Sequence, residues 1–135
     1  MRRLACVLFV VAAGCKPKSL KLADELDRSS SWLAAVAEIG RTTAQNSTPI
    51  GFAENAIEDA SAELNKSASK VEKIHVASDI ERDGKRLILA AEPKLDELRS
   101  DLEAAAADMH GNLAWLKAAS DTLSDLSERA RKARP

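Results

Sequence analysis

The sequence is poor in aromatic residues, with two tryptophans, two phenylalanines and no tyrosine among its 135 residues. It also lacks an excess of either charge, because 20 lysines and arginines stand against 21 aspartates and glutamates. Proteins that bind nucleic acid usually combine a basic surface with aromatic side chains that stack on bases. We therefore predict no nucleic-acid partner.

Glycine and proline are also scarce, at five and four residues. These two residues are the ones that most disfavour a helix interior, whereas alanine, leucine, glutamate, lysine and arginine favour it. The second group dominates this chain. The composition therefore predicts an all-α protein.

Both cysteines, Cys6 and Cys15, lie within the first 15 residues, so no disulfide can link two parts of the remaining chain. Long apolar runs are absent as well. The longest, residues 4–13, is about half of the roughly 20 residues that a helix needs to span a bilayer. We expect no permanent transmembrane helix.

The first 14 residues have the order of a secretory signal peptide. Arg2 and Arg3 supply the positive start, and the apolar run follows. The small residues Ala12, Ala13 and Gly14 come next, where a signal peptidase requires them. This order predicts a signal peptide over residues 1–14.

The four residues Ala12-Ala13-Gly14-Cys15 resemble the lipobox of bacterial lipoproteins. The resemblance implies that the Cys15 thiol receives a diacylglyceryl group and that a dedicated peptidase cuts after Gly14. It further implies that the freed amine of Cys15 is acylated and that Cys15 holds the protein at a lipid bilayer. More than one acyl chain generally gives stable attachment. The resemblance covers residues 1–15 only, and an ordinary signal peptide or a buried helix with a cysteine is the alternative.

Residues 15–19 read as the lipidated cysteine and a short basic linker. Lys16, Lys18 and Lys21 are candidates for contact with anionic headgroups, and a solvated linker is the alternative. Because so few residues follow Cys15 before the helical pattern begins, we expect the domain to stand directly on the membrane. Inner-membrane lipoproteins often have aspartate where this chain has Lys16. That resemblance favours the outer membrane, facing the periplasm or the cell surface.

Residues 20–135 show the periodicity of long helices. We expect helices over about 20–44, 49–91 and 93–133, because apolar residues recur at alternating steps of three and four. Such heptad seams predict an elongated antiparallel three-helix bundle with coiled-coil-like packing. The longest seam comprises Ile88, Ala91, Leu95, Leu98, Leu102, Ala105, Met109, Asn112, Leu116, Ala119, Leu123, Leu126, Ala130 and Ala133.

Two junctions between the second and third helices are possible. A turn at Asp83-Gly84 would leave Pro93 inside a helix, at a cost of about 3 kcal/mol. A turn at Glu92-Pro93 would leave only Gly84 inside, at about 1 kcal/mol, and is therefore preferred. A further break at residues 110–112, near Gly111, would instead produce a compact four-helix bundle.

Glu72 and His75 form a Glu-x-x-His pair, which di-iron helical bundles use twice. Here the pair occurs once, and Ile74 in the seam directs both side chains toward the surface. We therefore predict no metal site and no cofactor, with Glu72 and His75 as weak candidates.

The sequence carries no nucleophile elbow, phosphate-binding loop, HExxH motif or Cys–His pair. We expect a non-enzymatic lipoprotein of the cell envelope that binds an unknown envelope protein or associates with itself. The alternatives are a small ligand- or metal-binding bundle and a soluble secreted helical protein with a false lipobox.

Overall fold

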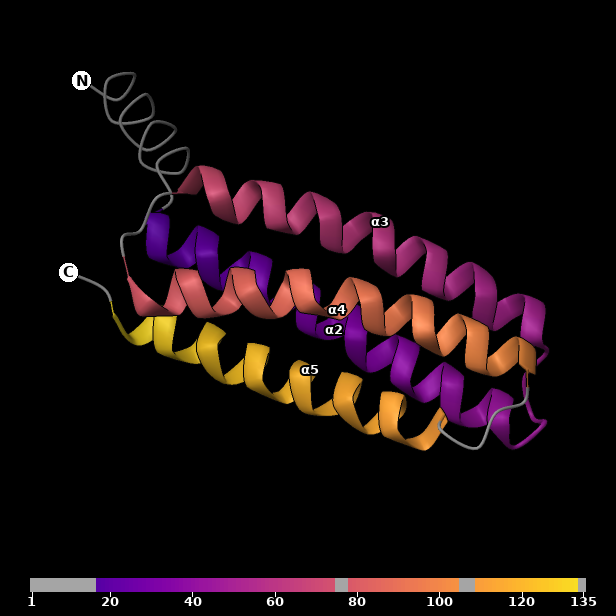
Figure 1. Ribbon diagram of the computed structural model, residues 1–135. Coiled ribbons are helices and arrows are strands. Elements are labelled where there is room, and N and C mark those ends of the chain that lie inside the picture. Colours follow the sequence, from indigo (N-terminus) through magenta and orange to yellow (C-terminus); the bar gives the residue numbers. More distant parts are fainter. Residues whose placement is uncertain (1–16, 75–77, 105–108, 134–135) are drawn as a thin grey trace, which may run out of the picture.

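The computed structural model describes residues 17–74, 78–104 and 109–133. Its four helices are α2 (Lys18–Ala44), α3 (Ile50–Ile74), α4 (Asp79–Ala104) and α5 (Met109–Lys132). Successive helices run in opposite directions, so that α2 and α4 begin at the end where α3 and α5 finish (Figure 1). The prediction of an all-α fold is confirmed.

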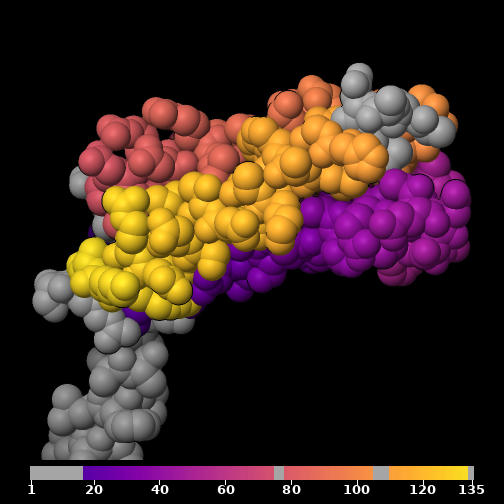
Figure 2. Space-filling model, turned by 90° about the horizontal axis from the view of Figure 1, so that it is seen from below, coloured from indigo at the N-terminus to yellow at the C-terminus, as the bar shows by residue number. Residues whose placement is uncertain are grey.

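The helices form a closed four-membered arrangement. Each packs against its neighbour in sequence, and α5 returns to pack against α2 over the largest contact of the bundle. Figure 2 shows α5 lying along α2 over much of their length. Of the two diagonal pairs, α2 and α4 approach each other.

The predicted three-helix bundle is wrong, and the four-helix alternative is correct. The segment expected as one helix over 49–91 is divided, since α3 ends at Ile74 and α4 begins at Asp79. The segment expected as one helix over 93–133 is divided too, between Ala104 and Met109. Gly111 therefore lies in the first turn of α5 rather than at the junction.

Neither predicted junction between the second and third helices is a turn, because Gly84 and Pro93 both lie inside α4. Gly84 is buried where α4 approaches α2, and a Cβ there would lie 2.5 Å from Leu26 Cδ2. Proline has no backbone N–H, so the carbonyl four residues before Pro93 has no helical donor. Pro93 is exposed, so water can reach that carbonyl. Close approach at Gly84 and exposure at Pro93 explain why helix continues through both.

The predicted seams form the core. One cluster of buried side chains extends through all four helices, and its largest members are less than 2% exposed. Seam residues of the longest predicted run stay buried on both sides of the break between α4 and α5. Those among them that the structure shows buried are Ile88, Ala91, Leu95, Leu98, Leu102, Asn112, Leu116, Ala119, Leu123, Leu126 and Ala130.

Small residues let α2 and α5 approach closely. Ser30 Oγ donates a hydrogen bond to the Ser120 backbone carbonyl at 2.7 Å, and Ser120 Oγ donates to the Ser30 carbonyl at 2.8 Å. Nearer the end of α5, Ser127 Oγ donates to the Ala23 carbonyl at 3.1 Å. These bonds satisfy hydroxyls that are buried between the two helices.

Candidate functional site

The two ends of the bundle carry different polar groups. The Lys18 end comprises the starts of α2 and α4 and the last turns of α3 and α5, and the Ala44 end is the opposite one (Figure 1). The helix α2 begins at Lys18, so Lys18 and Lys21 lie in its first turns, where both are exposed. Gly14, Cys15 and Lys16 lie outside the described residues. The Lys18 end is thus the one next to the predicted lipid anchor.

A basic groove of about 480 Å³ lies between α2 and α3 at the Lys18 end. It combines cationic side chains of both helices with two carboxylates and one apolar side chain. Its lining consists of Lys18, Lys21, Asp24, Glu25, Arg28, Lys70, Lys73 and Ile74. We call these residues the α2–α3 groove.

Glu25 is the polar centre of the α2–α3 groove. Its side chain is only 11% exposed, and it accepts a hydrogen bond from Ser67 Oγ of α3 at 3.0 Å. Arg28 Nη1 lies 3.4 Å and Lys70 Nζ 3.7 Å from Glu25 Oε1. A carboxylate with so little exposure is stabilised by such hydrogen-bonded and charged partners. By pairing with both, Glu25 also holds Arg28 of α2 close to Lys70 of α3.

The helical period places the remaining lysines on the same groove. On α2, Lys18 and Lys21 precede Glu25 by seven and four residues, which is one helix face. On α3, Lys73 follows Lys70 by three residues. Lys18, Lys21 and Lys73 form no ion pair with any residue among 17–74, 78–104 and 109–133. Sequence reasoning placed Lys18 and Lys21 near the membrane but missed Arg28, Lys70 and Lys73.

A further cationic side chain at this end, Arg131, forms ion pairs within the bundle. Arg131 of α5 forms an ion pair with Asp24 of α2 at 3.4 Å and another with Asp27. These pairs fasten the last turn of α5 to α2. Arg131 therefore serves the packing of the bundle and not the α2–α3 groove.

The weak metal candidates do not form a metal site in the described part of the chain. Glu72 Oε1 lies 3.2 Å from Lys85 Nζ of α4, so its partner is a cation of the protein. His75 lies outside the described residues. Over 17–74, 78–104 and 109–133, no three His, Cys, Asp or Glu side chains are close enough together to hold a metal ion.

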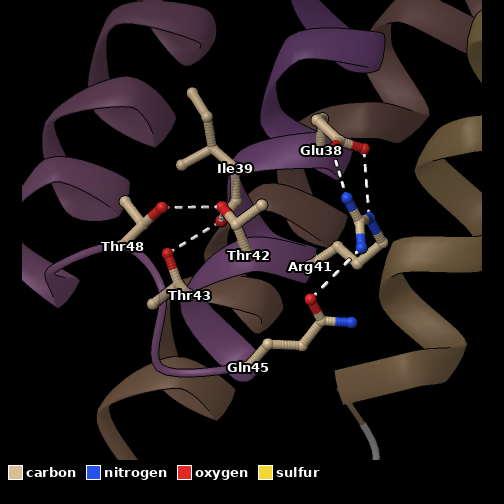
Figure 3. A network of polar contacts seen from close by, with 7 residues as sticks. All are labelled: Glu38, Ile39, Arg41, Thr42, Thr43, Gln45 and Thr48. Carbon is tan, nitrogen blue, oxygen red and sulfur yellow. Dashed lines mark hydrogen bonds and ion pairs between the residues drawn. The ribbon is translucent and has the colours of Figure 1, made fainter.

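At the Ala44 end, polar side chains organise the turn between α2 and α3 (Figure 3). Thr42 Oγ1 and Thr43 Oγ1 each donate to the Ile39 carbonyl, at 3.0 and 2.7 Å, and Thr48 Oγ1 donates to Thr42 Oγ1 at 2.8 Å. Asn46 takes a left-handed backbone conformation, with φ of 60°. Asparagine tolerates that conformation better than most residues, which suits it to a helix end.

The same end carries an exposed cluster of Glu38 and Arg41, in the last turns of α2, with Gln45, the residue after α2 (Figure 3). Arg41 Nε donates to Glu38 Oε2 at 3.1 Å, and Arg41 Nη1 donates to Gln45 Oε1 at 3.2 Å. The hydrogen bonds from Arg41 lower the pKa of the Glu38 carboxyl below its ordinary value. The hydrogen bonds to Glu38 likewise raise the pKa of Arg41.

A hollow of about 740 Å³ lies beside this turn, and Ile50 and His110 are among its lining residues. Ile50 is 41% exposed and Phe52, two residues further along α3, is 59% exposed. Large contiguous apolar patches rimmed by polar residues mark surfaces that contact other proteins, whereas single exposed apolar side chains are common on any protein. Ile50 and Phe52 are therefore two exposed apolar side chains that lie close in sequence at the Ala44 end.

Searches of protein-family models, curated proteins and solved structures found no match to this chain. None of the described helices combines the length and apolar composition needed to cross a membrane.

Proposed function

We propose that this chain is a bacterial lipoprotein that Cys15 anchors in a membrane of the cell envelope. The observation that carries the proposal is the order of the first 15 residues: two arginines, a short apolar run, three small residues and a cysteine. The start of α2 at Lys18 supports it, because only Lys16 and Pro17 separate Cys15 from the folded domain. The lipid would hold the Lys18 end of the bundle at the bilayer surface.

The four-helix domain acts in this proposal as a non-enzymatic module that contacts another envelope protein or a second copy of itself. The exposed Ile50 and Phe52 at the Ala44 end support a contact role. Lys16 directly after the anchor favours the outer membrane, facing the periplasm or the cell surface. In that position the Ala44 end would be the end farther from the anchor, about 40 Å along the bundle from the Lys18 end at 1.5 Å per residue.

Replacement of the anchor cysteine tests the proposal. Cys15→Ser should abolish labelling by fatty acids and the lipid mass on the mature N-terminus, because serine cannot form the thioether. Cys6→Ser is the matched control, since Cys6 lies in the apolar run, and it should leave labelling unchanged. Fatty-acid labelling that persists in Cys15→Ser would show that the lipobox is false.

A further inference from the structure

The α2–α3 groove holds more positive charge than the described carboxylates around it can neutralise. Five cationic side chains line it, and the only carboxylates among its lining residues are those of Asp24 and Glu25. Glu25 is already shared by Arg28, Lys70 and the Ser67 hydroxyl. Asp24 is also paired with Arg131 of α5. The charges of Lys18, Lys21 and Lys73 are therefore left for an anionic ligand.

We propose that the α2–α3 groove binds the phosphates of anionic phospholipid headgroups, so that the bundle leans with this flank on the bilayer. The inference rests on the proposed anchoring by Cys15, which lies three residues before Lys18. A tether of that length keeps the groove at the bilayer surface at all times. Cationic side chains beside a lipid anchor are attracted to anionic headgroups.

The length of the groove favours a leaning bundle over an upright one. Lys18 and Arg28 are ten residues apart on α2, which is about 15 Å along the helix axis. Charges separated by more than about 8 Å are largely screened at physiological ionic strength. In an upright bundle Arg28 and its neighbour Lys70 would lie beyond that range. When the α2–α3 flank rests on the surface, all five cations lie within it.

The charges of the whole bundle place the Lys18 end, and not the Ala44 end, at the surface. The half toward the Lys18 end carries 12 cationic and 11 acidic residues in its helices, whereas the other half carries four and nine. An anionic surface therefore repels the second half but not the first, so the contact with the bilayer is confined to the half that carries the α2–α3 groove. The first half comprises residues 18–31, 62–74, 79–91 and 121–132, and the second comprises 32–44, 50–61, 92–104 and 109–120.

Lysine reactivity on vesicles tests the proposal. The lipidated protein, purified from its native envelope, is placed in vesicles of phosphatidylcholine alone or of equimolar phosphatidylcholine and phosphatidylglycerol. A membrane-impermeant amine reagent then acylates exposed lysines, and mass spectrometry of peptides gives the rate at each site. Lys21, Lys70 and Lys73 should react several-fold more slowly on the anionic vesicles, and high salt should remove the difference.

Two lysines in the other half of the bundle are the internal controls. Lys94 lies on α4 and Lys117 on α5, away from the α2–α3 flank. Both should react at the same rate on the two kinds of vesicle. Equal rates for Lys70 and Lys73 on the two kinds of vesicle would overturn the proposal.

The same vesicle experiment is repeated with a variant whose groove has lost two positive charges. In the double variant Lys70→Gln/Lys73→Gln, the protection of Lys21 on anionic vesicles should be lost. The matched variant Lys94→Gln/Lys117→Gln should keep that protection. Thermal unfolding followed by circular dichroism should be the same for both variants, which excludes misfolding as the cause. Protection of Lys21 that survives in the neutralised groove would contradict the proposal.

Two further measurements distinguish this proposal from failure of the lipid anchor and from binding of free phosphate. A protein without lipid mass that fails to float with phosphatidylcholine vesicles would refute the anchoring, whereas a floating protein with equal lysine rates would refute the groove alone. Inorganic phosphate added without vesicles should leave the lysine rates unchanged. If it protected Lys70 and Lys73 as well as anionic vesicles do, the groove would be a site for free phosphate instead.

Discussion

At the scale of single residues, the neighbouring Ser29 and Ser30 of α2 show two opposite states of a buried hydroxyl. Ser30 Oγ is bonded to Ser120 of α5, as described above. Ser29 is fully buried, and its Oγ has no hydrogen-bond partner among the residues that the structure describes. A buried polar group without a partner lowers the stability of the folded state. The two serines should therefore respond oppositely to the same change.

Ser29→Ala should raise the free energy of unfolding by about 1 kcal/mol, because it removes an unpaired hydroxyl and because alanine favours helix. Ser30→Ala is the matched variant and should lower that free energy by about 1 kcal/mol, since it breaks the bond to α5. Urea unfolding followed by circular dichroism measures both. Destabilisation by Ser29→Ala would mean that its hydroxyl has a partner in solution.

At the scale of helices, periodicity predicted the buried faces well and the helix ends poorly. Leu95 and Leu123, which belong to the longest predicted seam, are both fully buried. Burial follows from local spacing, which a sequence shows directly. The ends of the helices depend on which segments pack together, and local spacing does not contain that information.

The two missed breaks show this limit. The apolar spacing of the second segment is interrupted at Ser78, one residue before α4 begins, but Gly84 and Pro93 were the stronger local signals for a turn. Between α4 and α5, residues 105–108 are three alanines and an aspartate. Alanine has the highest helix propensity, so nothing in that segment predicts a break. Ala105 also keeps the seam spacing.

The candidate site was predicted in part for a similar reason. Lys18 and Lys21 stood out because they lie close to Cys15 in sequence. Lys70 and Lys73 are about 50 residues further on, and they reach the same groove only because α3 packs against α2. The contact between Ser67 and Glu25 joins the two helices there. No local pattern in the sequence predicts that pairing.

Asn112 connects α4 and α5 across their break. It is 8% exposed in the seam of α5, and its Nδ2 donates to Asp101 Oδ2 of α4 at 2.6 Å. Asn112→Ala should lower the free energy of unfolding by about 1.5 kcal/mol, because a hydrogen bond to a charged group is lost. Asn65→Ala, on the exposed face of α3, is the matched control and should leave it unchanged or slightly higher. Urea unfolding measures both variants. If their free energies of unfolding changed by the same amount, the hydrogen bond would not stabilise the fold.

At the scale of the whole molecule, the seams are satisfied within one chain. The core cluster draws residues from all four helices, and its large side chains are buried without a second copy. Among the residues that the structure describes, the exposed large apolar side chains are Ile50, Phe52 and Leu89. Three such residues, of which only two are close in sequence, are a small surface for a stable dimer. The bundle therefore has no need of self-association to bury its core.

The chain from residue 15 onward with Cys15→Ser should consequently be a monomer. Its mass by light scattering should equal that of one chain and stay constant as the protein concentration rises. Such a result would favour a different envelope protein over a second copy as the partner of the anchored domain. Phe52→Ser is the companion variant, because it removes the most exposed of the three apolar side chains. A dimer that Phe52→Ser converts to a monomer would contradict the prediction and would place self-association at the Ala44 end.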